Sequence, residues 1–346
     1  MPPRPAFGRP PLAFAATLAG GLLPLAAHAA ACVNVDDDAA RLRCYDREAG
    51  RAPAPVPPLA APAPVMQAPT PVKDSALGRR WELDPGDRQA TFVFRPHRQN
   101  YVLPYSRTSA VNTAPYQPTL DALAGAGLIP STTLPVDAAE AKFQLSFKVK
   151  AWEDIVPGRA DLWLGYTQQS FWQVYNAGLS APFRETNYEP EAIFALRTDV
   201  DLGGLRWRHV NLGLVHQSNG RPEPLSRSWN RVYAEFGLER GPLAVSVRPW
   251  YRIRESAGKD DNPDITRFMG HGDVTVSYRA GAHQLGLAAR HNFSSGLGGA
   301  QVDWSFPLYG PLRGYVQAFS GYGYNLLDYN HRQTAGGIGV LLTDRL

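Results

Sequence analysis

The sequence predicts an all-β protein, a twelve-stranded antiparallel transmembrane β-barrel with an N-terminal periplasmic extension. From residue 90 onward, apolar and polar residues alternate with period two in segments of about ten residues. The connections between these segments alternate between short turns with Gly or Pro and longer loops, as in outer-membrane barrels. The chain also begins with the features of an export signal.

Residues 1–29 are predicted to be a secretory signal peptide. Arg4 and Arg9 form a positive region, residues 12–25 form an apolar region, and Ala-His-Ala at 27–29 resembles a cleavage site. Export leads to the periplasm or beyond, where disulfides persist. We therefore expect the mature chain to reside outside the cytoplasm.

The segment 30–50 holds both cysteines, Cys32 and Cys44. We expect a disulfide that clips a short N-terminal loop, with lipidation of Cys32 as the alternative. A metal site is disfavoured because no histidine lies nearby.

Residues 51–84 are interpreted as a Pro/Ala-rich linker. Eight prolines fall within positions 51–72, a composition typical of an extended and semi-rigid segment. The barrel domain is accordingly expected to span 85–346.

The period-two pattern is clearest at 142–151, where Phe143, Leu145, Phe147 and Val149 alternate with polar residues. A helix is disfavoured there because the apolar residues do not recur at three and four positions. A first strand is expected within 91–107, and the others fall near 160–175, 188–199, 205–218, 229–238, 242–253, 270–280, 283–293, 300–308, 312–322 and 333–343. An even count places both termini on the short-turn, periplasmic side.

The sequence disfavours two alternatives to this barrel. No run of about 20 apolar residues follows the N-terminal segment, which argues against transmembrane helices. A soluble β-sandwich is disfavoured by 242–253, where Arg248 and Arg252 share the face opposite Val245 and Val247. Arginines are costly in a dry core but ordinary in a polar barrel lumen.

A candidate catalytic group lies on the strand 205–218. Val210, Leu212, Leu214, His216 and Ser218 share one face, which becomes the lipid-facing one in a barrel. A Gly- and Pro-containing loop follows, and a hairpin centred on residue 223 would set Asn230 opposite His216. Residues paired in this way lie about 4.5–5.5 Å apart.

These three side chains suit nucleophilic catalysis. Ser218 would attack an acyl carbonyl, His216 would accept its proton, and Asn230 would fix the imidazole tautomer. A neutral amide is favoured over a carboxylate because a charge facing lipid is costly. The alternative is that all three residues simply mark the water interface.

At these residues the sequence resembles bacterial outer-membrane phospholipase A. The match includes His-Gln-Ser-Asn-Gly-Arg at 216–221 and Ser-Arg-Ser-Trp-Asn-Arg at 226–231, and it covers about residues 90–346. Further matching segments lie at 166–168, 171–173, 182–190, 249–251, 261–266 and 320–323.

The resemblance implies a calcium-dependent phospholipase of the outer membrane that acts as a dimer, with the active site facing the outer leaflet. It implies phospholipase A1/A2 and lysophospholipase activity with Ser218, His216 and Asn230 as the catalytic residues. The implied Ca²⁺ ligands are the carbonyl of Arg221 and the hydroxyl of Ser226, with the carbonyl of Ser180 from the partner. The backbone N–H of Ser218 is the implied oxyanion donor.

The resemblance also assigns Gln168 to the dimer interface, although a lone glutamine on the lipid face is otherwise an interfacial residue. The acidic cluster of Asp260, Asp261 and Asp264 is interpreted as a solvated loop instead of a second metal site. Two other functions compete with phospholipid hydrolysis: a non-enzymatic outer-membrane pore and lipid A deacylation. Head-group preference, sn-1 or sn-2 preference and the cellular trigger stay open.

Overall fold

The computed structural model describes residues 32–51, 75–130 and 134–344. The predicted signal peptide and most of the proline-rich segment lie outside these residues. The chain divides into two compact units, a small N-terminal one and a large one that contains every strand described here.

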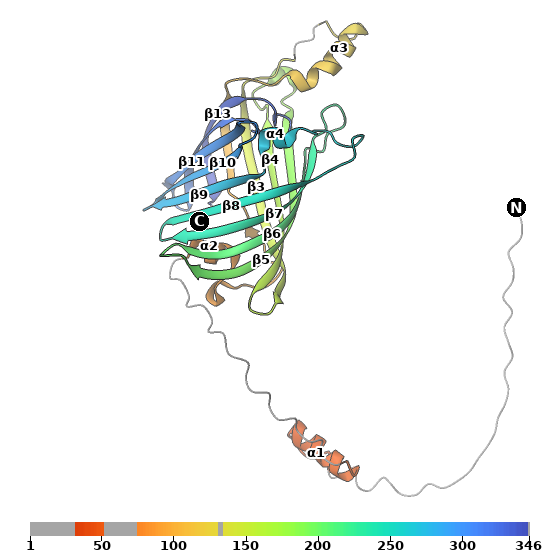
Figure 1. Cartoon of the computed structure of the whole chain (residues 1–346), viewed down its shortest axis with the longest axis vertical. Helices are drawn as coiled ribbons and strands as arrows, with labels where there is room; N and C mark the ends of the chain where they lie inside the picture. Colours follow the sequence, from red (N-terminus) through yellow and green to blue (C-terminus); the bar gives the residue numbers. More distant parts are fainter. Residues whose placement is uncertain (1–31, 52–74, 131–133, 345–346) are drawn as a thin grey trace, which may run out of the picture. The chain divides into compact units, whose positions relative to one another are not determined.

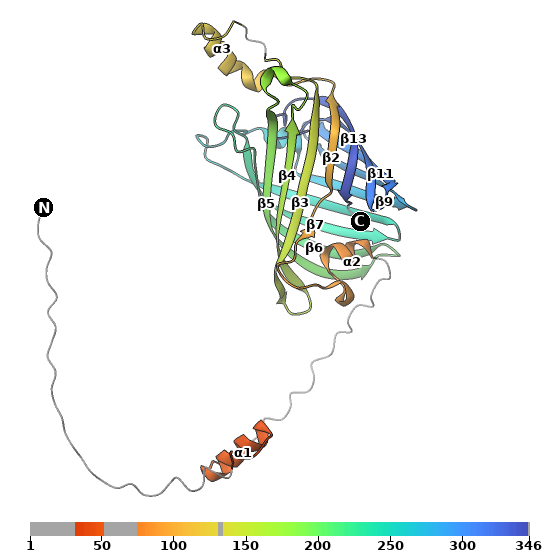
Figure 2. The ribbon, with the colours of Figure 1, turned by 180° about the vertical axis from the view of Figure 1, so that it is seen from behind.

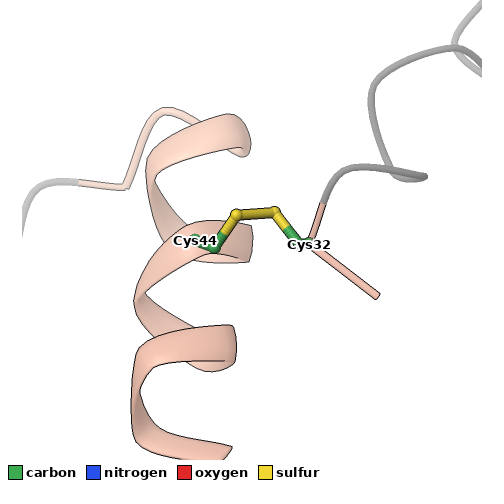
Figure 3. Close-up of a disulfide and its surroundings, with 2 residues drawn as sticks. All are labelled: Cys32 and Cys44. Atoms are coloured by element: carbon green, nitrogen blue, oxygen red, sulfur yellow. A yellow bond between two sulfur atoms is a disulfide. The ribbon is translucent and has the colours of Figure 1, made fainter. Parts of the chain in front are cut away.

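In its described residues, 32–51, the N-terminal unit contains one disulfide-clipped helix, α1 (Asp38–Glu48). The carboxylate of Asp37 accepts a hydrogen bond from the N–H of Ala40, which satisfies a free donor in the first turn. A disulfide joins Cys32, just before the helix, to Cys44 within it (Figure 3). The cross-link holds the preceding loop against the helix.

The large unit is a closed antiparallel β-barrel of twelve spanning strands (Figure 1). Each strand pairs with its neighbours in the chain, and the ring closes where β13 pairs with β2. A two-residue strand, β1 (Arg95–Pro96), adds to β3 next to the start of β2. The spanning strands are β2 (Asn100–Thr108), β3 (Ala139–Val156), β4 (Ala160–Trp172), β5 (Phe183–Asp201), β6 (Arg206–Ser218), β7 (Ser228–Arg240), β8 (Leu243–Ile253), β9 (Gly272–Ala280), β10 (His283–Asn292), β11 (Leu297–Tyr309), β12 (Leu312–Gly321) and β13 (Gln333–Thr343).

The connections alternate in length around the ring, as the sequence predicts. Short turns join β5 to β6, β7 to β8 and β9 to β10, and these turns lie at the end of the barrel that also holds β1. The opposite end carries longer connections with the helices α3 (Gln117–Gly125) and α4 (Ile265–Met269) and the 3₁₀ turns η2 (Ala114–Tyr116) and η3 (Ala177–Leu179). The prediction of a twelve-stranded barrel is confirmed.

Side chains alternate between a lipid-type exterior and a polar interior. On β6, Leu212 and Leu214 are about half exposed, whereas Gly213 between them and Asn211 and Val215 on either side are buried. This alternation is the one predicted for residues 205–218. No helix in the described ranges is long and apolar enough to cross a membrane.

The lumen at the short-turn end is filled by α2 (Ala76–Trp81), which Figure 2 shows inside the ring beside β6 and β7. Trp81 is buried among Trp163, Ile193 and other lumen-facing residues. The Lys148 ammonium lies 3.1 Å from the centre of the Trp81 ring, a cation–π contact.

Charged groups anchor this helix to the barrel wall. Ser75, the N-cap of α2, donates a hydrogen bond to Glu239 on β7, and Arg208 on β6 forms an ion pair with Asp84 at 2.6 Å. The η1 turn (Pro85–Asp87) follows. The expected linker 51–84 thus contains residues 75–84, which belong to the folded barrel. The proline-rich composition identifies the segment before residue 75. It gives no signal for the six-residue helix that follows, because the apolar residues of this helix are buried in the lumen and not in a core that the local sequence pattern predicts.

The long-loop end of the lumen is closed by a second network. Arg184 on β5 pairs with Glu140 on β3 and with Asp328 in the loop before β13. The same Asp328 accepts hydrogen bonds from Asn112 and Asn325. Ile265 and Met269 of α4 add an apolar cluster with Trp229 and Trp250. Both ends of the lumen are therefore packed.

Candidate active site

The β6–β7 hairpin sets His216 and Asn230 directly opposite each other. Both lie on the outer face, on which the next outward-facing pair along the hairpin is Leu214 and Val232. His216 Nδ1 is 2.8 Å from Asn230 Oδ1. Because an amide oxygen only accepts hydrogen bonds, Nδ1 carries the proton and Nε2 is left to accept one. The predicted pairing of these two residues is observed.

Ser218 lies two residues beyond His216, at the end of β6. Its Cα pairs with Tyr188 on β5 and with Ser228 on β7, and its side chain is half-buried. Among the described residues, no hydrogen bond joins Ser218 to His216. The two side chains share the outer face, so the serine hydroxyl and the imidazole project to the same side of the sheet.

Gln217, between them in sequence, points into the barrel and fixes this part of β6. Its side-chain oxygen accepts hydrogen bonds from Trp229 Nε1 at 2.8 Å and from the guanidinium of Arg231 at 3.2 Å. Trp229 is fully buried, and the Arg231 guanidinium lies 4.0 Å from the centre of its ring. The backbone that carries His216 and Ser218 is thus held by a packed interior contact.

The loop after Ser218 is organised by one buried amide, Asn219. Its Oδ1 accepts hydrogen bonds from the N–H groups of Arg221 and Arg227, and its Nδ2 donates to the carbonyl of Leu225. These bonds cross the loop and give it a defined shape. Arg221 then reaches back to β5, donating to the carbonyls of Phe183 and Arg184.

The three implied calcium ligands fall in two loops. Arg221 and Ser226 share the β6–β7 loop, while Ser180 ends the η3 turn between β4 and β5, where it is exposed and has a φ of 58°. Within the described residues, no hydrogen bond joins Ser180 to the other two. Ser226 Oγ donates to Asp261 Oδ2 at 2.5 Å.

Two acidic residues near the site were missed by the sequence reasoning. Asp261 contacts Ser226, whereas the sequence predicts a solvated loop for its acidic cluster. Glu255 accepts a hydrogen bond from Asn230 Nδ2 at 2.8 Å. The alternation of side chains along a strand is the signal that could have identified Glu255. Asn230 pairs with Ile253, and Glu255 lies two residues further along on the same face.

Gln168 shares a lateral row with the candidate nucleophile. Its Cα pairs with Leu145 on β3 and with Tyr188 on β5, and Tyr188 in turn pairs with Ser218. Adjacent strands lie about 4.8 Å apart, so Gln168 is about 10 Å from Ser218 along the surface. Its amide donates to Ser170 and accepts from the hydroxyl of Tyr166.

Comparison with known proteins gives consistent matches. The family model described as phospholipase A1 matches residues 77–342. A putative phospholipase A1 of Neisseria meningitidis serogroup B is 42% identical over 273 residues, covering 78% of this chain and 70% of that protein.

Two solved structures are similar to the barrel. One is a Salmonella typhi outer membrane phospholipase, a dimer with bound calcium, which is 37% identical with a TM-score of 0.69 and covers 80% of this chain and 100% of that one. The other is outer membrane phospholipase A from Escherichia coli with an active-site asparagine replaced by alanine, which is 38% identical with a TM-score of 0.67. It covers 75% of this chain and 95% of that one. The family model spans most of the chain and the barrel matches in fold, so the chain belongs to the phospholipase A1 family of bacterial outer-membrane β-barrels.

Proposed function

We propose that this phospholipase is calcium-dependent and dimeric, and that it cleaves acyl esters of glycerophospholipids with Ser218, His216 and Asn230. The observation that carries the proposal is the 2.8 Å contact between His216 Nδ1 and Asn230 Oδ1 on the apolar exterior. A substrate in the surrounding bilayer reaches this face without entering the lumen. The asparagine substitution in the Escherichia coli active site supports the role given to Asn230.

The reaction follows the usual course of a serine hydrolase. Ser218 Oγ attacks the ester carbonyl while His216 Nε2 takes its proton, and the imidazolium then donates that proton to the departing glycerol or lysolipid oxygen. Water next attacks the acyl-serine with His216 again as the base, which releases fatty acid and restores Ser218. We place the backbone N–H of Ser218 as donor to the oxyanion. The same chemistry would accept a lysophospholipid.

Asn230 orients His216 in both half-reactions. Because its oxygen accepts the Nδ1 proton, the imidazole presents an unprotonated Nε2 toward the face that Ser218 shares. A carboxylate at this register position would face the bilayer and would be costly to desolvate. The neutral amide gives the same orientation without that cost.

Calcium would be held at the β6–β7 loop. The Ser226 hydroxyl and the Arg221 carbonyl are hard oxygen donors of the kind that Ca²⁺ prefers. The Asp261 carboxylate beside Ser226 adds negative charge, and a hydrogen bond between Glu223 and Asp261 raises the pKa of Glu223. This crowding of carboxylates fits a site for a divalent cation. The bound ion would stabilise negative charge that develops on the substrate carbonyl.

Dimerisation would complete the site. The Salmonella typhi relative is a calcium-bound dimer, and the exposed Ser180 is placed to offer its carbonyl to a neighbouring molecule. Gln168 lies on the same outer surface as Ser218, among the apolar residues Leu145 and Leu164. A glutamine amide buried between two such faces would find its partner in the second copy.

The packed lumen favours an enzyme over a pore. The α2 helix occupies one end and the Arg184–Asp328 network closes the other. The barrel is a transmembrane β-barrel of the bacterial outer membrane, so the short-turn end would face the periplasm and the catalytic residues the outer leaflet. Residues 1–29 would be removed as a signal peptide, and the proline-rich segment would tether the N-terminal unit.

The deciding experiment compares the parent protein with Ser218→Ala and Ser228→Ala in phospholipid micelles with calcium. Ser228 pairs with Ser218 across the hairpin and serves as the matched serine control. We expect Ser218→Ala to fold as a barrel and lose hydrolysis, while Ser228→Ala keeps it. Full activity in Ser218→Ala would refute the assigned nucleophile. Turnover of lipopolysaccharide in preference to phospholipid would point to lipid A deacylation.

A further inference from the structure

The loop between β8 and β9 brings a carboxylate to the far side of Asn230. Asn230 Nδ2 donates to Glu255 Oε1 at 2.8 Å, while Asn230 Oδ1 faces His216 Nδ1, also at 2.8 Å. Glu255, Asn230 and His216 therefore form one continuous chain of hydrogen bonds. Resting on the catalytic roles proposed above, we infer that Glu255 is a positioning residue for phospholipid hydrolysis that acts through Asn230.

The strand register explains how Glu255 reaches this point. Asn230 on β7 is paired with Ile253, the last residue of β8. Glu255 lies two residues beyond, so it projects to the same side and is a diagonal neighbour of Asn230. Diagonal neighbours lie about 7–8 Å apart, a span that a glutamate side chain bridges.

The carboxylate settles which way the amide of Asn230 points. A carboxylate oxygen only accepts hydrogen bonds, so Nδ2 must face Glu255 and Oδ1 must face His216. Without Glu255 the amide loses the partner that distinguishes its two ends. A flipped amide would present N–H groups to His216 Nδ1, which favours the wrong imidazole tautomer.

The positions of Asn230 and Glu255 relative to the membrane explain why the carboxylate contacts Asn230 and not His216 itself. Asn230 lies within β7 on the apolar exterior, where a carboxylate is costly. Glu255 lies past the end of β8 in a loop, where its side chain is partly exposed to solvent. The amide thus links a solvated negative charge to the imidazole, and that charge favours the imidazolium formed during acyl transfer.

The test is a double-mutant cycle between Glu255→Ala and Asn230→Ala, measured as kcat and KM on phospholipid micelles with calcium. We expect Glu255→Ala to lower kcat about tenfold with little change in KM, a coupling of the size that residues in one hydrogen-bonded network show. In the Asn230→Ala background, Glu255→Ala should cause no further loss. Glu255→Asp should recover part of the activity, since it restores the acceptor.

Asp121→Ala is the matched control. Asp121 is exposed in a loop helix and likewise accepts a hydrogen bond from a side-chain amide, that of Gln117, at 2.7 Å. It should leave kcat unchanged, and heat-unfolding midpoints should show that all variants fold.

Parent-like kcat in Glu255→Ala would overturn the inference, as would an equal loss with and without Asn230. If Asn230→Ala itself keeps full activity, the assigned triad fails, which is a separate and recognisable result.

Discussion

The hydroxyl of Ser226 is hydrogen-bonded to the carboxylate of Asp261, with 2.5 Å between Oγ and Oδ2. The contact joins the β6–β7 loop, which follows the candidate nucleophile, to the β8–β9 loop. A second bond runs from the N–H of Ser228, the first residue of β7, to the side chain of Asn262 in the same β8–β9 loop. The geometry beside Ser218 therefore depends on two loops that lie far apart in sequence.

Asp261→Asn is predicted to weaken calcium activation. The substitution removes negative charge beside Ser226, so the calcium concentration for half-maximal activity should rise about 10- to 100-fold. Activity should disappear with a chelator and return on adding calcium in the parent protein. Asp260→Asn, in the same loop but paired with Arg252, is the control. Hydrolysis that is indifferent to chelation would contradict the metal assignment.

Gln168→Ala is predicted to weaken the dimer. The side chain lies on the apolar outer face, where its loss removes a polar contact between two barrels. Sedimentation in detergent with substrate analogue and calcium should show a larger monomer fraction. Gln169→Ala is the matched control because Gln169 faces inward and bonds to the hydroxyl of Tyr101. Equal monomer fractions in both variants would contradict the interface assignment.

Asp328→Asn is predicted to destabilise the barrel in a pH-dependent way. Burial alone would raise the pKa of Asp328, but the Arg184 guanidinium and hydrogen bonds from Asn325, Gln333 and Asn112 lower it below its ordinary value. The ionised carboxylate therefore stabilises the fold above the unfolded pKa of about 3.9, and this contribution is lost as the pH falls through the lowered folded value.

The corresponding measurement is unfolding in detergent micelles at pH 7 and below pH 4. At pH 7 the free energy of unfolding of the variant should be lower by about 3 kcal/mol, because the buried Arg184 charge loses one of its two carboxylate partners and keeps only Glu140. The difference in the free energy of unfolding between parent and variant should become smaller as the pH falls. A gap that stays constant with pH would show that the ionisation of Asp328 does not stabilise the fold.

Gly213→Ala is predicted to destabilise the hairpin that carries the active site. A Cβ at Gly213 would lie 2.1 Å from the ring of Tyr233, whose hydroxyl donates to Glu191. Overpacking of this kind costs about 1–3 kcal/mol. Gly336→Ala, where the nearest atom would be 3.8 Å away, is the control. Equal unfolding midpoints for the two variants would contradict the prediction.

The sequence predicts most of the barrel because both of its signals, the period-two alternation within strands and the alternation of short and long connections, can be seen along the chain without knowledge of the fold. Alternation in segments such as 142–151 identifies the strands, and a hairpin centred on residue 223 fixes the partner of His216 from sequence distance alone. That is why the pairing with Asn230 could be found without a structure.

Contacts that depend on loop conformation could not be found in this way. Asp261 lies in the β8–β9 connection, and its contact with Ser226 is set by how that loop folds back. The sequence likewise predicts a barrel unit that starts at residue 85, after α2, because this helix has only six residues and is stabilised by groups more than a hundred positions away.

The α2 helix also constrains how the barrel can be made. Residues 75–81 precede every strand, yet Ser75 is bonded to β7 and Trp81 packs against β4 inside the ring. The last strand, β13, closes the ring against β2. Because α2 packs on the inside of the ring that this seam closes, the seating of the N-terminal segment and the closure of the barrel are expected to stabilise each other.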